Sequence, residues 1–292
     1  MTVAPNRSPD TAPQVPTVAL VTDSGSQLPA TLQRRMGVGV VPLTVVINGR
    51  EYLEGSGDLA SDDFYRSIAD GADVSTAAPS PGQFLEVYRA AARMGASQIL
   101  SIHTGSNLSG TVGSAAVAAR MVSRRTEVID TGMVSFPVAC CVWAAGVVLE
   151  RGGTLADAAG VARLAVSNVD SVSVVGGCEL ARRSGRMPED AGEGLPVVAL
   201  RSGIVDVVDR VADAGEAVDA MVAYVRARAD GRPQRVGVGH AVAGQVADEL
   251  ASRLAAEVDV VEVIRYELGP SVGAHTGPGT AGCVFFPDEL VR

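Results

Sequence analysis

The stretch QILSIHTGSNLSGTVGSAAVAARM, residues 98–121, contains the unit from which the first half of the chain is built. Its apolar beginning, QILSIHT, predicts a buried strand, and its alanine-rich end, SGTVGSAAVAARM, predicts a helix. Hydroxyl side chains, two glycines and a histidine gather in HTGSNLSGT (103–111), where the strand passes into the helix. Because the same succession of strand and helix recurs on both sides of this stretch, we expect a parallel sheet covered by helices.

The flanking sequence divides the chain into three regions. Residues 1–16 are rich in proline and polar side chains and predict a disordered tail. Residues 17–168 alternate between strands and helices and predict an N-terminal α/β domain with a parallel sheet, in which GVVPLTVVING (39–49) forms the second strand. From residue 169 the pattern changes, and LPVVALRSGIVDVVDRV (195–211) predicts two consecutive strands. Residues 169–292 therefore predict a C-terminal mixed α/β domain.

Capping residues mark the boundaries of two helices in the first domain. Ser61 is the predicted N-cap of the helix SDDFYRSIA. Ser80 is the predicted N-cap of the next helix, in a capping box with Gln83, and Gly95 is expected to end that helix. The longest apolar run, FPVACCVWAAGVVLE from Phe136, is too short to cross a membrane and predicts a buried helix.

The composition excludes several classes of function. The formal net charge is −9, so nucleic acid is not an expected partner, because phosphate neutralisation needs clustered cations. The chain contains no lysine, which excludes nucleotide binding by a P-loop and catalysis through a lysine Schiff base. The four cysteines form no CxxC pair, so neither a zinc site nor a disulfide framework is expected. The start of the chain carries no signal-peptide pattern, and we expect a reduced, cytoplasmic environment.

Three side chains are candidates for binding a small carboxylate. Thr76 lies just before the helix capped by Ser80, and Ser109 lies where the helix after the quoted strand begins. His275 lies in SVGAHTGPGTAG, which is expected to be a loop between two late strands. Loops that follow parallel strands gather at one edge of a sheet, and helix N-termini present free N–H groups there. Neutral donors at that edge would bind an anion without a formal cation, and Ser106 is a secondary donor candidate.

Each of these residues also has a structural interpretation. A serine at the start of a helix is commonly only an N-cap, Thr76 can be a loop hydroxyl, and His275 can be a turn residue. His103 and His240 end apolar strands and are interpreted as packing or surface residues. A dyad of Ser109 and His275 would suit a serine hydrolase, although neither a G-x-S-x-G elbow nor an orienting carboxylate is evident.

Five motifs occur in a fixed order along the chain. They are VALVTDSGSQLP (18–29), GVGVVPLTVVINGREYLEG (37–55), STAAPSPGQF (75–84), GSNLSGTVGSA (105–115) and AHTGPGTAG (274–282). Together they resemble the DegV family of fatty-acid-binding proteins, over about residues 17–292. The third motif keeps Thr76 of the family's Thr-Ser-Gln-Pro-Ser pattern but has Ala77 and Ala78 where the family has Ser and Gln. The fourth has Gly105 in place of the family's first serine.

This resemblance implies a DegV-like two-domain protein that binds a long-chain, palmitate-like fatty acid and uses no other cofactor and no metal. It implies that Thr76, Ser109 and His275 hold the carboxylate near the domain junction, with the acyl chain in an apolar tunnel of the C-terminal domain. In kinase-coupled members a separate ATP-dependent kinase phosphorylates the bound carboxylate. The expected partners are therefore a fatty acid kinase subunit and, transiently, a membrane, in phospholipid metabolism. The protein itself is expected not to be an enzyme.

One region departs from the family pattern. Arg183 and Arg186 lie in RRSGRM, which family members follow with a helix and an apolar strand, whereas PEDAGEGLP follows directly here. The two arginines are candidates for contact with a kinase or with a phosphorylated head group, or they are plain solvated charges. The alternatives to lipid binding are a serine-dependent hydrolase of small esters and a regulatory protein that works without lipid.

Overall fold

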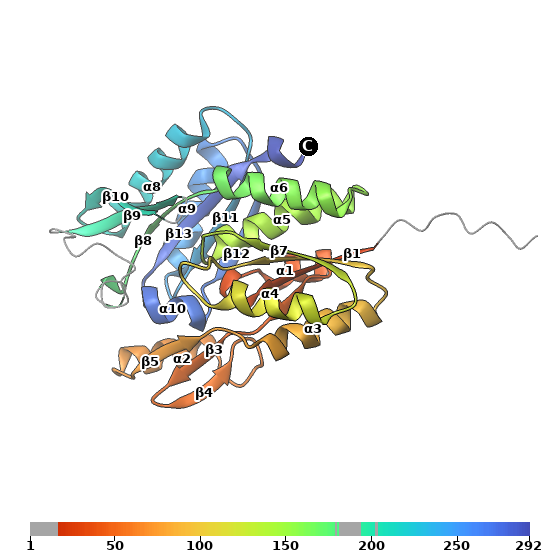
Figure 1. Cartoon of the computed structure of the whole chain (residues 1–292). Coiled ribbons are helices and arrows are strands. Elements are labelled where there is room, and N and C mark those ends of the chain that lie inside the picture. The colour runs from red at the N-terminus through yellow and green to blue at the C-terminus, as the bar shows by residue number, and fades with distance from the viewer. Residues whose placement is uncertain (1–16, 179, 181–193, 202–203) are drawn as a thin grey trace, which may run out of the picture.

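The computed structural model describes residues 17–178, 180, 194–201 and 204–292, arranged as two lobes that pack against each other (Figure 1). We call residues 17–168 the N-terminal lobe and the described residues from 169 onward the C-terminal lobe. The predicted tail, residues 1–16, lies outside the described residues, as do Arg183 and Arg186.

A four-stranded parallel sheet forms the centre of the N-terminal lobe, as predicted. Its strands, in spatial order, are β2 (Gly39–Val41), β1 (Val18–Asp23), β6 (Gln98–His103) and β7 (Arg125–Asp130). The helices of this lobe are α1 (Ala30–Met36), α2 (Ser61–Ala69), α3 (Pro81–Arg93), α4 (Thr111–Met121), α5 (Phe136–Glu150) and α6 (Leu155–Asn168), with the short 3-10 helix η1 (Ser24–Ser26). Side chains alternate along each strand, so Val21 and Ile99 pack with α3 and α4, while Leu20 and Leu100 pack with α5 and α6.

A second, antiparallel sheet in this lobe was not predicted. Its order is β4 (Arg50–Leu53), β3 (Thr44–Ile47) and β5 (Val74–Ala77). The prediction of one strand over residues 39–49 was wrong, because Pro42 separates β2 from β3 and has no N–H group for a ladder. Asn48 and Gly49 then form a two-residue turn, with φ of 50° and 80°, that pairs β3 with β4.

The C-terminal lobe is built on a six-stranded mixed sheet. Its order is β10 (Ile204–Val211), β9 (Leu195–Arg201), β8 (Asp170–Val174), β13 (Ala281–Pro287), β11 (Gln234–His240) and β12 (Val260–Glu267). The remaining elements are α8 (Ala214–Ala229), α9 (Gly244–Glu257), α10 (Pro270–Thr276) and the 3-10 helix η2 (Asp288–Val291). Cys283 and Phe285 of β13 pack with α8 and α9, whereas Val284 and Phe286 pack with α5.

Helix α5 is the buried helix predicted from its apolar sequence. Every residue from Phe136 to Val147 is buried. Trp143 meets Phe286 edge-on, with ring centroids 5.4 Å apart, and Phe136 stacks on Tyr266 of β12 at 4.2 Å. Gly237 makes this stacking possible, since a Cβ there would lie 2.1 Å from the Phe136 ring. Among the described residues, no helix has both the length and the apolar character needed to span a membrane.

The helix boundaries confirm some capping predictions and correct others. Ser80 caps α3 in a capping box with Gln83, as predicted, and α3 ends at Arg93, just before Gly95 with φ of 100°. Ser61 is the first residue of α2 rather than its N-cap, which is Ala60 and has no side chain that can cap the helix. The expected loop around His275 is in part the helix α10, which begins with a proline at its first position, where the missing N–H costs nothing.

Candidate functional site

A cavity of about 890 Å³ lies where β5, the loop after β6 and α10 meet. Residues of the N-terminal lobe contribute most of its wall, and Leu180 and α10 close it from the C-terminal lobe. The lining consists of Gly25, Leu43, Ile68, Gly71–Ala78, Thr104, Leu108–Gly110, Val134, Leu180, Ser271, Val272, Ala274 and His275. The predicted apolar tunnel within residues 169–292 stays a prediction, because few of these residues belong to that region and residues 181–193 lie outside the described chain.

The structure brings Thr76, Ser109 and His275 to this one cavity. Thr76 lies on β5, paired with Val45, rather than in a loop, and its Oγ1 is 3.3 Å from His275 Nε2. Ser109 lies two residues before α4, and its hydroxyl is 2.7 Å from that of Thr111. Two hydroxyl groups and one imidazole from three separate elements therefore face the same space.

The N-terminus of α4 faces the cavity as well. Its N-cap, Gly110, lines the cavity and supplies no capping side chain, so the positive end of the helix dipole is directed there. Among the described lining residues no lysine or arginine occurs, and Asp73 is the one carboxylate, exposed before the start of β5. Thr76 is three residues further along the chain, roughly 10 Å away in an extended strand. An anion beside Thr76 would thus be held by neutral donors.

Ser106 is not brought to the cavity, although it was a secondary donor candidate. It is exposed, and both its backbone N–H and its hydroxyl donate to the carboxylate of Asp130 at the end of β7. Partial burial of Asp130 opposes ionisation, but the hydrogen bonds from Ser106 and Gly132 outweigh it and lower the pKa of Asp130. Ser106 therefore fixes the loop after β6 to the neighbouring strand.

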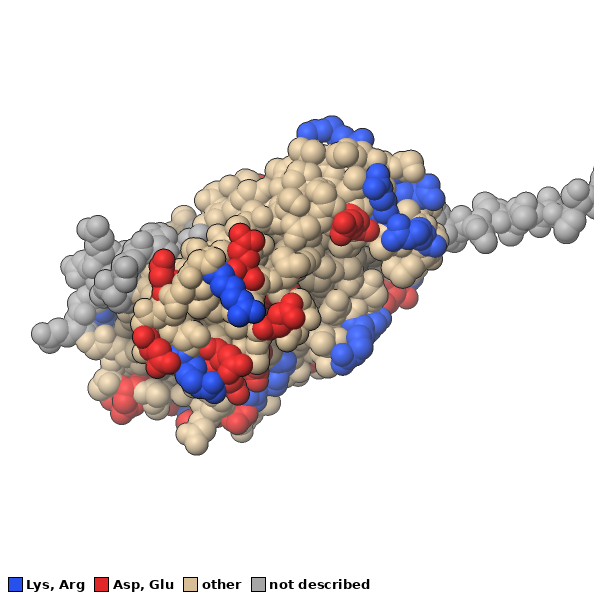
Figure 2. Space-filling view, turned by 90° about the horizontal axis from the view of Figure 1, so that it is seen from below, with Lys and Arg blue, Asp and Glu red and all other residues tan. Residues whose placement is uncertain are grey.

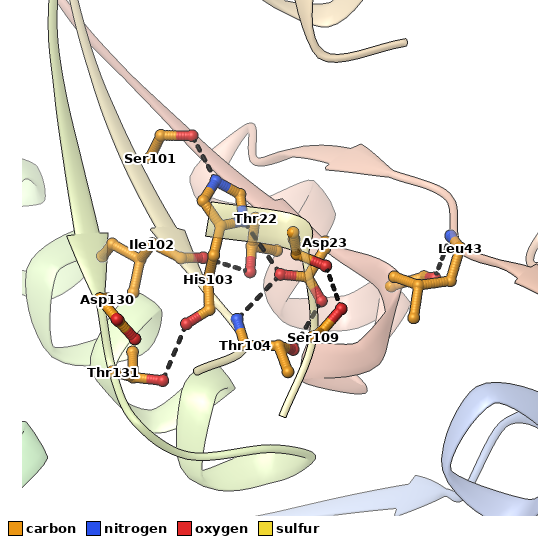
Figure 3. A network of polar contacts seen from close by, with 12 residues as sticks. Thr22, Asp23, Leu43, Ser101, Ile102, His103, Thr104, Ser109, Asp130 and Thr131 are labelled. Atoms are coloured by element: carbon orange, nitrogen blue, oxygen red, sulfur yellow. Dashed lines mark hydrogen bonds and ion pairs between the residues drawn. The ribbon is translucent and has the colours of Figure 1, made fainter. Parts of the chain in front are cut away.

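The fully buried Asp23, at the end of β1, was missed by sequence reasoning and holds the other side of the same loop (Figure 3). Its carboxylate accepts hydrogen bonds from Thr104 N (3.0 Å), Thr104 Oγ1 (2.8 Å) and His103 Nδ1 (2.9 Å). Thr104 and Ser109, both labelled in Figure 3, line the same cavity. Because β1 and β6 are parallel neighbours that end at the same edge, the Asp-Ser step after β1 is the signal that could have indicated this contact.

His103 extends this network into the core. Tyr88 OH lies 2.8 Å from Ser101 Oγ, and Ser101 Oγ lies 2.5 Å from His103 Nε2. Burial raises the pKa of Tyr88 to about 12, so the phenol stays neutral. Ser101, His103 and Asp23 follow the order of a hydrolase triad, but all three are fully buried and neither Ser101 nor His103 lines the cavity. Of the two interpretations of His103, as a packing or a surface residue, the structure excludes the surface and adds hydrogen bonds to Ser101 and Asp23.

Helix α10, which carries His275, is fastened to the N-terminal lobe by two residues that the sequence did not single out. Gln27 Oε1 accepts from Gly269 N, and Gln27 Nε2 donates to Ser271 Oγ at 3.2 Å. Glu54 Oε1 accepts from Ser271 N at 2.9 Å, and burial raises the pKa of Glu54 above its usual value. The position of His275 therefore depends on polar contacts made more than 200 residues away in sequence.

Gly105 occupies a place without room for a side chain. Its N–H donates to Met133 O at 2.8 Å, and its carbonyl accepts from Ser109 N at 3.0 Å. A Cβ at this position would lie 2.5 Å from the Cα of Gly132. The close approach of residues 105 and 132 thus sets the turn that presents Ser109 to the cavity.

Comparisons with known proteins agree with this architecture. The family profile described as "Uncharacterised protein, DegV family" matches residues 17–288. A DegV domain-containing protein of Streptomyces coelicolor is 34% identical over 276 residues, which span 91% of this chain and 97% of that protein. A structure described as fatty acid binding of a DegV family protein from Thermus thermophilus has a TM-score of 0.86 at 31% identity, covering 93% of this chain and 99% of that one.

A more distant structure, DegV of Bacillus subtilis, shares the fold at 21% identity with a TM-score of 0.82, covering 93% of this chain and 99% of that one. The match to the family profile and the match to the Streptomyces relative both extend over nearly all of the described chain. The chain therefore belongs to the DegV family.

Proposed function

We propose that the protein binds a long-chain fatty acid, with its carboxylate between Thr76, Ser109 and His275 and its acyl chain along the cavity. The convergence of these three side chains on one cavity of about 890 Å³ carries the proposal. The Thermus thermophilus relative, 31% identical and of the same fold, is described as binding fatty acid, and this supports it. The cavity volume is in the range of small-molecule sites.

The head group gains its affinity from hydrogen bonds rather than from an ion pair. A buried carboxylate is costly unless donors meet it. Thr76 and Ser109 supply hydroxyl donors, His275 supplies a ring N–H in a suitable tautomer, and α4 adds the positive end of its dipole. Each charge-assisted hydrogen bond contributes about 1.5–3 kcal/mol.

The acyl chain supplies most of the binding free energy. Burial of methylene groups stabilises the complex by roughly 0.8 kcal/mol each, so a sixteen-carbon chain gains on the order of 10 kcal/mol before the cost of immobilisation. The apolar lining residues come from both lobes: Leu43, Ile68, Leu108 and Val134 from the first, Leu180 and Val272 from the second. An acyl chain in this cavity would therefore contact both lobes at once.

We further propose that the bound carboxylate is presented to a separate ATP-dependent kinase. In such a transfer a carboxylate oxygen attacks the γ-phosphorus of ATP and forms an acyl phosphate, with ADP as the leaving group. Phosphoryl transfer needs cations that stabilise the transferred group. The described lining of the cavity contains no lysine or arginine, so we assign these cations to the kinase, with Arg183 and Arg186 as further candidates. Addition of a fatty acid kinase with ATP and measurement of acyl phosphate would test this step.

The head-group assignment is tested with delipidated protein and a fluorescent fatty acid. We expect the double variant Thr76→Ala/Ser109→Ala to bind at least tenfold more weakly, since two charge-assisted hydrogen bonds are lost. The variant Thr126→Ala/Ser97→Ala is a matched control, because it removes the same atoms from residues outside the cavity. Equal affinity of both variants and the parent would contradict the assignment. Native mass spectrometry of the purified protein would identify a co-purified acid.

A further inference from the structure

The ends of α3 and α4 that point away from the cavity form a separate surface. Both helices begin at the cavity edge, where Gly110 lies beside Ala78. Helix α4 has eleven residues, so its last residue, Met121, is roughly 16 Å from that edge. The two helices pack on each other, and their C-terminal ends therefore lie side by side on the far edge of the parallel sheet.

Five arginines gather at this far edge: Arg89, Arg93, Arg120, Arg124 and Arg125, all exposed. Ten other arginines of the described chain form salt bridges, but within the described residues none of these five has a carboxylate within 4 Å. The chain contains no Asp or Glu at all from residue 87 to residue 126. This surface is thus positive in a protein whose formal net charge is −9.

Apolar side chains accompany the arginines. Met94, directly after α3, is 83% exposed, and Met121 is 59% exposed. A shallow hollow of about 390 Å³ has Met121 and Val122 in its lining together with Arg89, Arg93 and Arg124. We call this hollow, with Met94, Arg120 and Arg125, the basic face. Figure 2 views the molecule from the side of α2 and α3 and shows Arg side chains gathered toward one end, with some acidic side chains among them, and both signs of charge mixed at the other end.

The chemistry of the basic face favours a lipid surface over other anionic partners. Guanidinium groups bind phosphate oxygens in pairs, and each basic residue near an anionic bilayer strengthens attachment. Exposed methionines gain from burial among glycerol and acyl groups, which a nucleic acid backbone does not offer. The negative charge of the rest of the molecule repels an anionic surface, so the protein would approach it in one orientation.

We propose that the basic face docks on the anionic phospholipids of a bilayer. Arg89 and Arg93 contact lipid phosphates while Met94 and Met121 enter the interface between head groups and acyl chains. Because α3 and α4 run from the cavity edge to this face, the docked protein keeps Thr76 and the cavity on the side away from the bilayer. The docking does not depend on fatty acid binding and is measured without it.

The test is co-sedimentation of the full chain with vesicles of phosphatidylcholine alone or with phosphatidylglycerol added. We expect binding only to the anionic vesicles, and weaker binding as salt screens the arginines. In Arg89→Gln/Arg93→Gln the partition coefficient should fall about 25-fold, at about fivefold for each charge removed. The matched control Arg50→Gln/Arg201→Gln loses the same charge from two exposed arginines outside the basic face and should bind like the parent.

Insertion of the side chain at position 94 into the bilayer is measured separately with a fluorophore. An environment-sensitive dye on Met94→Cys, in a Cys178→Ser background, should shift to shorter wavelength on anionic vesicles, since the remaining cysteines are buried. Circular dichroism confirms that each variant is folded. Absence of vesicle binding by the parent, equal loss of binding in both arginine pairs, or binding to an acidic protein without binding to vesicles would overturn the proposal.

Discussion

Substitution of Asp23 separates two contributions of its carboxylate to stability: the hydrogen bonds that it accepts and its negative charge. Three donors point at this carboxylate: Thr104 N and His103 Nδ1 at Oδ2, and Thr104 Oγ1 at Oδ1. Asp23→Ala leaves all three without a partner in a place that water does not reach. Asp23→Asn keeps an oxygen for the first two donors and places an NH₂ group against the Thr104 hydroxyl, which can accept.

The two variants should therefore differ in stability. Loss of a buried partner costs about 1–3 kcal/mol for each unsatisfied donor, and removal of one member of a buried charged pair costs about 3–5 kcal/mol. We expect Asp23→Ala to lose about 4 kcal/mol of unfolding free energy, or a melting temperature lower by roughly 10 °C. We expect Asp23→Asn to lose only about 1 kcal/mol, because the hydrogen bonds persist without the charge.

Urea unfolding followed by circular dichroism measures both values, with the parent protein delipidated so that ligand does not contribute. Asp23→Ala should also weaken fatty acid binding, because Thr104 and the loop that carries Ser109 lose their anchor. An equally large loss in Asp23→Asn would refute the hydrogen-bond account and show that an ionic pair with a charged His103 dominates. A loss below about 1 kcal/mol in Asp23→Ala would refute the role of the network altogether.

Three further outcomes follow from the contacts around the cavity. Gly105→Ala should destabilise the fold by about 1–3 kcal/mol in the same unfolding assay, because its Cβ meets the backbone of Gly132, and a neutral effect would contradict the packing there. Ser106→Ala should weaken fatty acid binding by no more than about threefold in the fluorescence assay, because only the hydroxyl bond to Asp130 is lost and the backbone N–H bond still holds the loop. A tenfold loss would instead indicate that Ser106 contacts the head group. Burial raises the pKa of Glu54, so its protonated form stabilises the fold. This contribution is complete below the pKa of the unfolded chain and is lost as the pH rises through the pKa of the folded protein. The melting temperature of Glu54→Gln should therefore decline less than that of the parent above about pH 4.5.

The regular strand–helix units could be predicted from periodicity, but the elements that complete the site could not. The parallel sheet followed from alternating apolar runs, and Ser80 with Gln83 followed from a capping box. The antiparallel sheet that carries Thr76 was missed, although Asn48–Gly49 is a strong hairpin signal. Helix α10 was missed because seven residues with little helix propensity give no period.

The contacts that position the site join residues far apart in the chain. Asp23 and His103 are 80 residues apart, and Glu54 and Ser271 are 217 apart. A single sequence contains no information on such pairs until the strand order is known. The motifs nevertheless indicated Thr76, Ser109 and His275, and the structure brings all three to one cavity. Their role as fatty acid ligands stays a prediction.

The packing of the central helix α5 between the two lobes limits how a ligand can enter the cavity. Its Trp143 and Phe136 pack against aromatic rings of the C-terminal lobe while its other side packs on the parallel sheet, so one hydrophobic cluster extends across both lobes. A hinge motion that separates the two lobes would have to pull these rings apart and expose them to water. Admission of a long flexible molecule must instead rely on short displacements near the rim, and heat should unfold both halves in one cooperative step.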